Sequence, residues 1–139
     1  DHLHKELMPE EVYAVFAENY LNISTPLELL DYHFVRNHDV FKVVLTVKYN
    51  GWEQDVTATG NGRLDAVSNA VKKLTGMQYT LTTYQEHALD KGSTARAVSY
   101  VGIEMQDGKT VWGAGVHEDI IAASIMGLIS AVNHAEVSK

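Results

Sequence analysis

An internal repeat of roughly fifty residues is the feature that most constrains how this chain can fold. The phrases Thr57-Ala58-Thr59-Gly60-Asn61-Gly62 and Thr110-Val111-Trp112-Gly113-Ala114-Gly115 both precede a helical pattern. Each phrase also follows two strand-like runs joined by a tight turn, Asn50-Gly51 in the first copy and Asp107-Gly108 in the second. Two such copies predict two units of one fold around a pseudo-twofold axis, where equivalent helix starts face each other across a seam.

Each copy predicts three strands followed by a helix. Apolar alternation and turn residues mark the strands, and apolar residues at helical spacing mark the helices. The predicted strands are 31–36, 41–49 and 52–59, then 77–87, 95–105 and 109–114, and the predicted helices are 64–74 and 118–134. We therefore predict an α+β fold of two pseudo-symmetric βββα units, 31–76 and 77–139, with antiparallel strands and helices packed on one face.

The first thirty residues have no counterpart in the repeat. Pro9-Glu10-Glu11 is a favourable helix start, because proline suits the first turn and acidic side chains suit the helix dipole. Ser24-Thr25-Pro26 starts a second short turn. We predict that residues 1–30 form a short helical linker subdomain, which would join the repeat domain to the rest of a longer protein.

The last predicted helix is apolar almost all round. It carries Ile120, Ile121, Ile125, Met126, Leu128, Ile129 and Val132. Such a helix must be covered on more than one side, and in so small a domain a second subunit is the simplest cover. Burial inside one chain is the alternative, but large apolar patches usually mark interfaces. This pattern favours a homodimer.

Composition excludes several classes of function. The chain has 139 residues, a net charge of −7 and no cysteine. Without a basic stripe, nucleic acid and anionic membranes are not expected as partners. No uninterrupted apolar run reaches the roughly 18 residues that span a bilayer. The absence of cysteine removes thiol chemistry and disulfides, which suits a cytoplasmic protein.

The Gly-x-Gly phrases are predicted at strand ends, directly before helices. Backbone amides there, with the helix dipole, form a ready site for an anion such as a carboxylate. The alternative is that the glycines serve only the turn. Neither phrase has the third glycine of a dinucleotide fingerprint, and the chain has no Gly-Lys-Ser/Thr phosphate loop.

No catalytic constellation is evident in the sequence. Glu86-His87 and Asp31-His33 lie in strand-like runs with no nucleophile nearby, so salt links are the simpler interpretation. His2 and His4 lie close to the first residue, and no metal site is predicted. Ser124 can bond a ligand or bond back to a helix carbonyl. The residues alone therefore predict a binding or dimerisation module without a cofactor.

Several segments resemble one known family, the C-terminal regulatory domain of 2-isopropylmalate synthase of the long-form type. In the second unit they are Glu86-His87-Ala88-Leu89, Gly92 to Tyr100, Val111 to Val116, Asp119-Ile120 and Ser130 to Asn133. In the first unit they are Gly60-Asn61-Gly62 and Asp65-Ala66. Pro9-Glu10-Glu11 to Leu21 and Pro26-Leu27-Glu28 resemble part of the linker subdomain that precedes this domain.

The resemblance implies a function. The full enzyme of that family is a transferase that condenses acetyl-CoA with 2-oxoisovalerate in leucine biosynthesis. Its catalytic barrel, which holds a divalent metal, has no counterpart in this chain. The regulatory domain of the family dimerises and binds L-leucine as a feedback inhibitor between its units, near the dimer seam.

The resemblance also implies a leucine site. Its residues here are Gly92, Ser93, Thr94, Ala97, Gly113, Ala114, Gly115, Val116, His117, Asp119, Ile120, Ile121, Ala123 and Ser124, with Gly60, Asn61, Gly62 and Asp65 as possible equivalents from the other unit. Amides at the second Gly-x-Gly turn would bind the carboxylate, and Asp119 or a carbonyl the ammonium. Ala97, Ala123 and the isoleucines would shape a pocket for the isobutyl group. The chain departs from many relatives at Arg63, where proline is common, and at His117, where relatives vary.

Two alternatives remain. One is the regulatory domain of citramalate synthase, which has the same shape and responds to isoleucine. The other is a purely structural dimerisation module with no working ligand site. The linker-like segment at 9–21 favours the leucine-responsive family.

Overall fold

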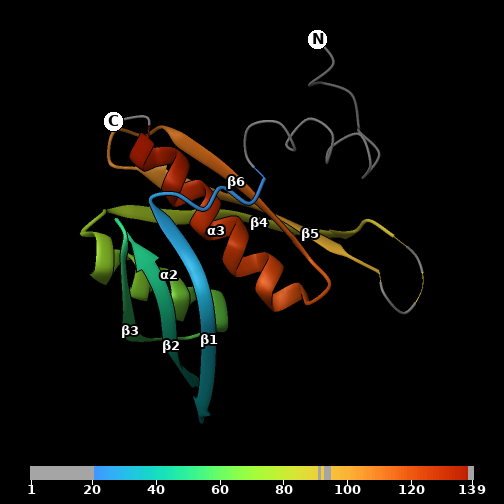
Figure 1. The fold of residues 1–139 in the computed structure, drawn as a ribbon, viewed down its shortest axis with the longest axis horizontal. Helices are drawn as coiled ribbons and strands as arrows, with labels where there is room; N and C mark the ends of the chain where they lie inside the picture. Colours follow the sequence, from blue (N-terminus) through green and yellow to red (C-terminus); the bar gives the residue numbers. More distant parts are fainter. Residues whose placement is uncertain (1–20, 91, 93–94, 138–139) are drawn as a thin grey trace.

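The computed structural model describes residues 21–90, 92 and 95–137, and it confirms the predicted α+β repeat. Two three-stranded antiparallel sheets, in the orders β1-β2-β3 and β4-β5-β6, are each followed by a helix (Figure 1). The first unit comprises β1 (Leu27–Asn37), β2 (Val40–Tyr49), β3 (Trp52–Gly60) and α2 (Arg63–Thr75). The second comprises β4 (Tyr79–Ala88), β5 (Ala97–Met105), β6 (Thr110–His117) and α3 (Ile120–Val137).

The repeat extends to the turns and irregularities of the strands. Asn50 and Gly51 have φ values of 51° and 87°, and Gly108 has a φ of 87°, as the hairpin turns require. The register of β1 with β2 shifts between Leu29 and Asp31, and that of β4 with β5 shifts between Leu81 and Thr83. These two irregularities occupy equivalent places, so both units bend in the same way.

The first strand begins earlier than predicted. Residues 27–30, assigned above to the helical segment, are extended and continue directly into the rest of β1. Leu27 is fully buried, and its backbone is held by a side chain more than one hundred residues away, Asn133. That long-range anchor explains why local sequence did not reveal the strand. The predicted helix at Pro9 and the histidines near the N-terminus lie outside the described residues.

The chain itself covers most of α3, so the apolar composition of this helix does not require the second subunit that the sequence analysis invoked to cover it. One side of α3 packs on β5 and β6, and β1 and α2 contact it elsewhere. Figure 1 shows β1 (blue) running beside α3 (orange to red). The small residues Ala122, Ala123 and Gly127 are buried along the helix and allow close approach. The apolar circumference therefore reflects burial inside one domain.

The apolar length of α3 also passes a simple test for membrane spans. It has 18 residues and a mean hydropathy of 1.5. However, 67% of this window is buried inside the domain, and a buried core helix passes the same test. The burial explains the composition of α3 without a membrane.

Candidate functional site

The glycines of the second Gly-x-Gly phrase serve close packing of a helix on a sheet. Gly113 and Gly115 lie inside β6, which continues to His117, so the predicted position at the strand end is wrong. A Cβ on Gly113 would lie 2.1 Å from the amide nitrogen of Ala131. A Cβ on Gly115 would lie 2.2 Å from the carbonyl oxygen of Ala123. Both distances are far below van der Waals contact, so α3 can approach β6 this closely only where side chains are missing.

The first Gly-x-Gly phrase does lie between a strand end and a helix start. Gly60 ends β3, and Gly62 is the N-cap residue of α2. No side chain caps this helix start with a hydrogen bond. The Asp65 carboxylate instead accepts the Asn61 N–H at 2.9 Å. The first turn of α2 therefore keeps backbone donors available to an anion.

The start of α3 is, by contrast, already capped. The Asp119 carboxylate accepts hydrogen bonds from the Ile121 N–H at 3.0 Å and from the Tyr32 hydroxyl at 2.5 Å. The bond from Tyr32 is the main cause of a lowered pKa for Asp119. Burial, followed by the bond to Asp119, raises the pKa of Tyr32 to about 12. The Asp119 N–H also donates to Nδ1 of His117. These contacts leave α3 less open to a carboxylate than α2.

A cavity of about 230 Å³ lies at the seam, where the starts of the two helices meet. We call it the seam cavity. Its lining comes from both units: Phe34, Arg63, Leu64, Tyr84, Glu86, Ile120, Ile121, Ser124 and Ile125. Three residues of the predicted leucine site, Ile120, Ile121 and Ser124, are among them. The seam cavity thus has the position that the repeat predicts.

One end of the seam cavity carries a chain of polar contacts. The Ser124 hydroxyl lies 2.6 Å from the Tyr84 hydroxyl and 3.2 Å from that of Ser99. Tyr84 also donates to the Glu86 carboxylate at 2.5 Å. Burial, followed by the bond to Glu86, raises the pKa of Tyr84, so its hydroxyl remains protonated and donates. Ser124 additionally bonds back to the Ile120 carbonyl at 2.8 Å, so the predicted back-bond is present.

The other predicted site residues are not all in the seam cavity. Ala123 is fully buried where α3 packs on β6. Ala114 is buried on the opposite face of β6, in a separate small cluster against which Val116 packs. Ala97 begins β5 and pairs with His117. Gly92 lies in the β4–β5 loop with a φ of 107°, and Ser93 and Thr94 lie outside the described residues. Since β5 begins, and β6 ends, at the end of the sheet where α3 starts, these segments still share one end of the second unit.

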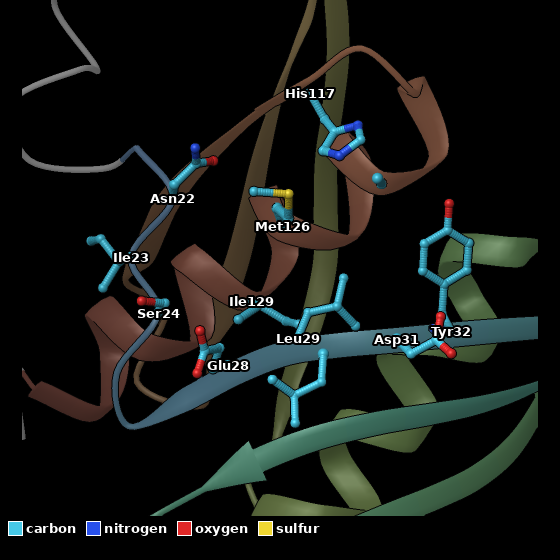
Figure 2. Close-up of a pocket in the computed structure, with 12 residues that line it drawn as sticks. Asn22, Ile23, Ser24, Glu28, Leu29, Asp31, Tyr32, His117, Met126 and Ile129 are labelled. Atoms are coloured by element: carbon cyan, nitrogen blue, oxygen red, sulfur yellow. The ribbon is translucent and has the colours of Figure 1, made fainter.

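A second cavity, of about 280 Å³, lies between residues 22–24, β1 and α3 (Figure 2). Met126 and Ile129 of α3 line it together with Leu29 of β1, and His117 lies at one end. Its charged lining residues include the carboxylates of Glu28 and Asp31, with no lysine or arginine among them. A carboxylate ligand would be repelled there, so the seam cavity is the better candidate for a zwitterion.

The seam cavity includes residues that sequence analysis did not assign to a site. Phe34, Leu64 and Tyr84 lie in the predicted elements 31–36, 64–74 and 77–87 and had no assigned role in a site, and Glu86 was interpreted as part of a salt link. Arg63 stood out only as a departure from the usual proline. The alternation of Tyr84 and Glu86 along β4 places them on one face, but nothing local shows that Phe34 and Arg63 lie opposite. Among the described residues no cluster of three or more His, Asp or Glu is arranged to hold a metal.

Comparison with known proteins gives a consistent result. Residues 6–136 match the family model described as the LeuA allosteric (dimerisation) domain. Similar proteins include the 2-isopropylmalate synthases of Desulfitobacterium hafniense, 47% identical over 133 residues, and of Helicobacter hepaticus, 40% identical over 141 residues. Both alignments cover 96% of this chain but only 24% and 25% of the relatives. The chain therefore spans about a quarter of the length of these proteins.

Proposed function

The chain belongs to the family of LeuA allosteric (dimerisation) domains, and from that premise we propose that it is the leucine-binding regulatory domain of a 2-isopropylmalate synthase. In this proposal the chain is not itself catalytic. It pairs with a second copy, binds L-leucine as a feedback inhibitor, and controls a metal-dependent catalytic barrel in the rest of a cytoplasmic biosynthetic enzyme. The family description supports dimerisation and effector binding in general. Leucine as the effector, and the place where it binds, are our proposal.

The seam cavity is the observation that carries the assignment. Its volume of about 230 Å³ is below the roughly 300–1,000 Å³ typical of sites for drug-sized ligands, which suits an amino acid. Five of its nine lining residues are apolar: Phe34, Leu64, Ile120, Ile121 and Ile125. The others include one cation and one carboxylate. An apolar lining that also carries one positive and one negative side chain matches a zwitterion with an aliphatic side chain.

We assign roles from this arrangement. The ammonium group lies near the Glu86 carboxylate, with the hydroxyls of Tyr84 and Ser124 beside it. The isobutyl group packs on Ile120 and Ile121. The carboxylate approaches the uncapped first turn of α2, where backbone donors and the helix dipole favour an anion. This differs from the role that the resemblance gave to the α3 start, because Asp119 already caps that helix.

We propose leucine rather than isoleucine as the effector because of the enzymes to which the chain is similar. Eight proteins with similar sequences, from different bacteria, are all 2-isopropylmalate synthases. A branch at the β-carbon would also place a methyl group close to the charged end of the site, where the polar contacts lie.

The thermal midpoint of the purified chain, measured with leucine, isoleucine and valine, tests the proposal. Leucine at about one hundred times its Kd should stabilise the fold by about 2.7 kcal/mol, which raises the midpoint by several degrees. Glu86→Gln should weaken leucine binding by roughly tenfold, because it removes the charge that faces the ammonium. Glu86 is exposed, so the midpoint without ligand should hardly change.

Glu104→Gln is the matched control, since Glu104 is an exposed glutamate on β5 that does not line the seam cavity. It should leave the leucine response unchanged. A larger shift with isoleucine would assign the domain to the citramalate synthase type. No shift with any of the three amino acids would leave a structural dimerisation module and refute the proposal.

A further inference from the structure

We propose that Arg63, held by the ring of Phe41, binds the effector carboxylate and restricts the seam cavity to α-amino acids with a free carboxylate. This inference rests on the proposed effector site and adds a specificity-determining residue to it. It concerns a side chain at a position where the resembled family commonly has proline, which has no cationic group.

The Arg63 side chain lies at the seam cavity, and its N–H donors are not used by other described residues. It is the first residue of α2, and it lines the seam cavity beside Leu64. Its guanidinium carbon lies 4.9 Å from the centroid of the Phe41 ring, within the range of a cation–π contact. Among the described residues, the guanidinium makes no hydrogen bond and no ion pair. Its N–H groups are therefore available to a ligand.

The location of Phe41 explains why the guanidinium stays at the cavity. Phe41 lies on β2 and pairs with Gly60, the last residue of β3 before α2 begins. The ring therefore lies next to the first turn of the helix. The guanidinium carbon of Arg36 lies 5.5 Å from the same ring, but its Nε donates to the His38 carbonyl in the β1–β2 turn. Arg36 does not line the seam cavity, and among the described residues that do, Arg63 is the one cation.

Two features then converge on one end of the cavity. The planar guanidinium can bind both oxygens of a carboxylate, and the uncapped start of α2 adds backbone donors and a favourable dipole. Glu86 supplies a negative charge elsewhere in the lining. A ligand with only an ammonium group would leave Arg63 unpaired, and an amide would offer it no charge. The lining therefore selects the zwitterion.

Calorimetric titration of the whole chain with leucine, leucinamide and 3-methylbutylamine tests this inference. The wild type should bind leucine at least tenfold more tightly than either analogue. Arg63→Gln should weaken leucine binding tenfold to one hundredfold, the effect of one charge-assisted contact, and should remove most of the preference over leucinamide. Arg63→Lys, which keeps the charge but not the planar fork, should restore part of the affinity.

Two further variants separate positioning from general effects. Phe41→Leu should weaken leucine binding about two- to fivefold, because Arg63 loses the ring that orients it. Arg36→Gln removes the other cation on that ring and should change nothing. Thermal midpoints without ligand verify that each variant is folded.

The outcomes distinguish this inference from the proposed function. If Arg63→Gln binds leucine as tightly as the wild type, or keeps the full preference over leucinamide, the role of Arg63 is refuted while the effector site stands. If the wild type binds no leucine, the proposed function and this inference both fail.

Discussion

Replacing Gly115 with alanine is expected to destabilise the folded domain by about 3 kcal/mol or more, which lowers the thermal midpoint by roughly 10 °C. The added Cβ would lie 2.2 Å from the carbonyl oxygen of Ala123 and 2.5 Å from the amide nitrogen of Gly127. Both atoms belong to the backbone of α3, so no side chain can rotate away to relieve the clash. The helix must move off the sheet, and core packing along α3 is lost.

The equivalent glycine of the first unit is the matched control. Gly62 is the last residue of the corresponding phrase, but a Cβ there would meet nothing within 4 Å, and its φ of −146° suits any residue. Gly62→Ala should therefore cost less than about 1 kcal/mol, mostly through a poorer N-cap. Urea unfolding of both variants measures the difference. If Gly115→Ala and Gly62→Ala lost the same stability, α3 would not pack on β6 as closely as described.

The second large effect is expected at Asn133, which joins the C-terminal half of α3 to the first residue of β1 and to the segment before it. Its side chain is fully buried. Its Nδ2 donates to the carbonyls of Ile23 and Leu27, both at 2.7 Å, and its Oδ1 accepts the Leu27 N–H at 2.8 Å. Asn133→Leu fills similar space but leaves these three backbone groups without that partner. Each buried polar group without a partner costs about 1–3 kcal/mol.

We therefore expect Asn133→Leu to reduce the free energy of unfolding by about 3 kcal/mol and to speed hydrogen exchange at the Leu27 amide. Asn69→Ala is the control, because Asn69 makes a single, exposed bond to the Thr59 carbonyl. It should change stability by less than about 1 kcal/mol. Slow exchange at Leu27 in Asn133→Leu would show that this segment is held by other contacts, such as the bond from the Asn22 N–H to the Ala114 carbonyl.

These two positions show what local sequence can and cannot reveal. The hairpin turns at Asn50-Gly51 and Asp107-Gly108 were predictable, because the positive φ values of Asn50, Gly51 and Gly108 favour those residue types. The order of strands and helices followed from the repeat. Yet the same Gly-x-Gly pattern has different structural roles in the two units. Gly113 and Gly115 admit a helix backbone, whereas Gly62 leaves a helix start uncapped, and only tertiary packing distinguishes the two.

The seam cavity was predictable in position but not in composition. The facing helix starts, and Ile120, Ile121 and Ser124 with them, followed from the repeat and the resemblance. Phe34 and Arg63 come from the other unit, and their distance along the chain hides their proximity. The cover of α3 was missed for a similar reason. An all-round apolar helix looks the same whether β1 or a second subunit buries it.

The most direct test of the central claim is where leucine binds, which backbone amide chemical shifts of the labelled chain can report during a titration. The account predicts the largest shifts at Leu64, Tyr84, Ile121 and Ser124, which line the seam cavity from both units. Shifts concentrated around Leu29, Met126 and Ile129 would instead place the ligand in the cavity of Figure 2 and contradict the account.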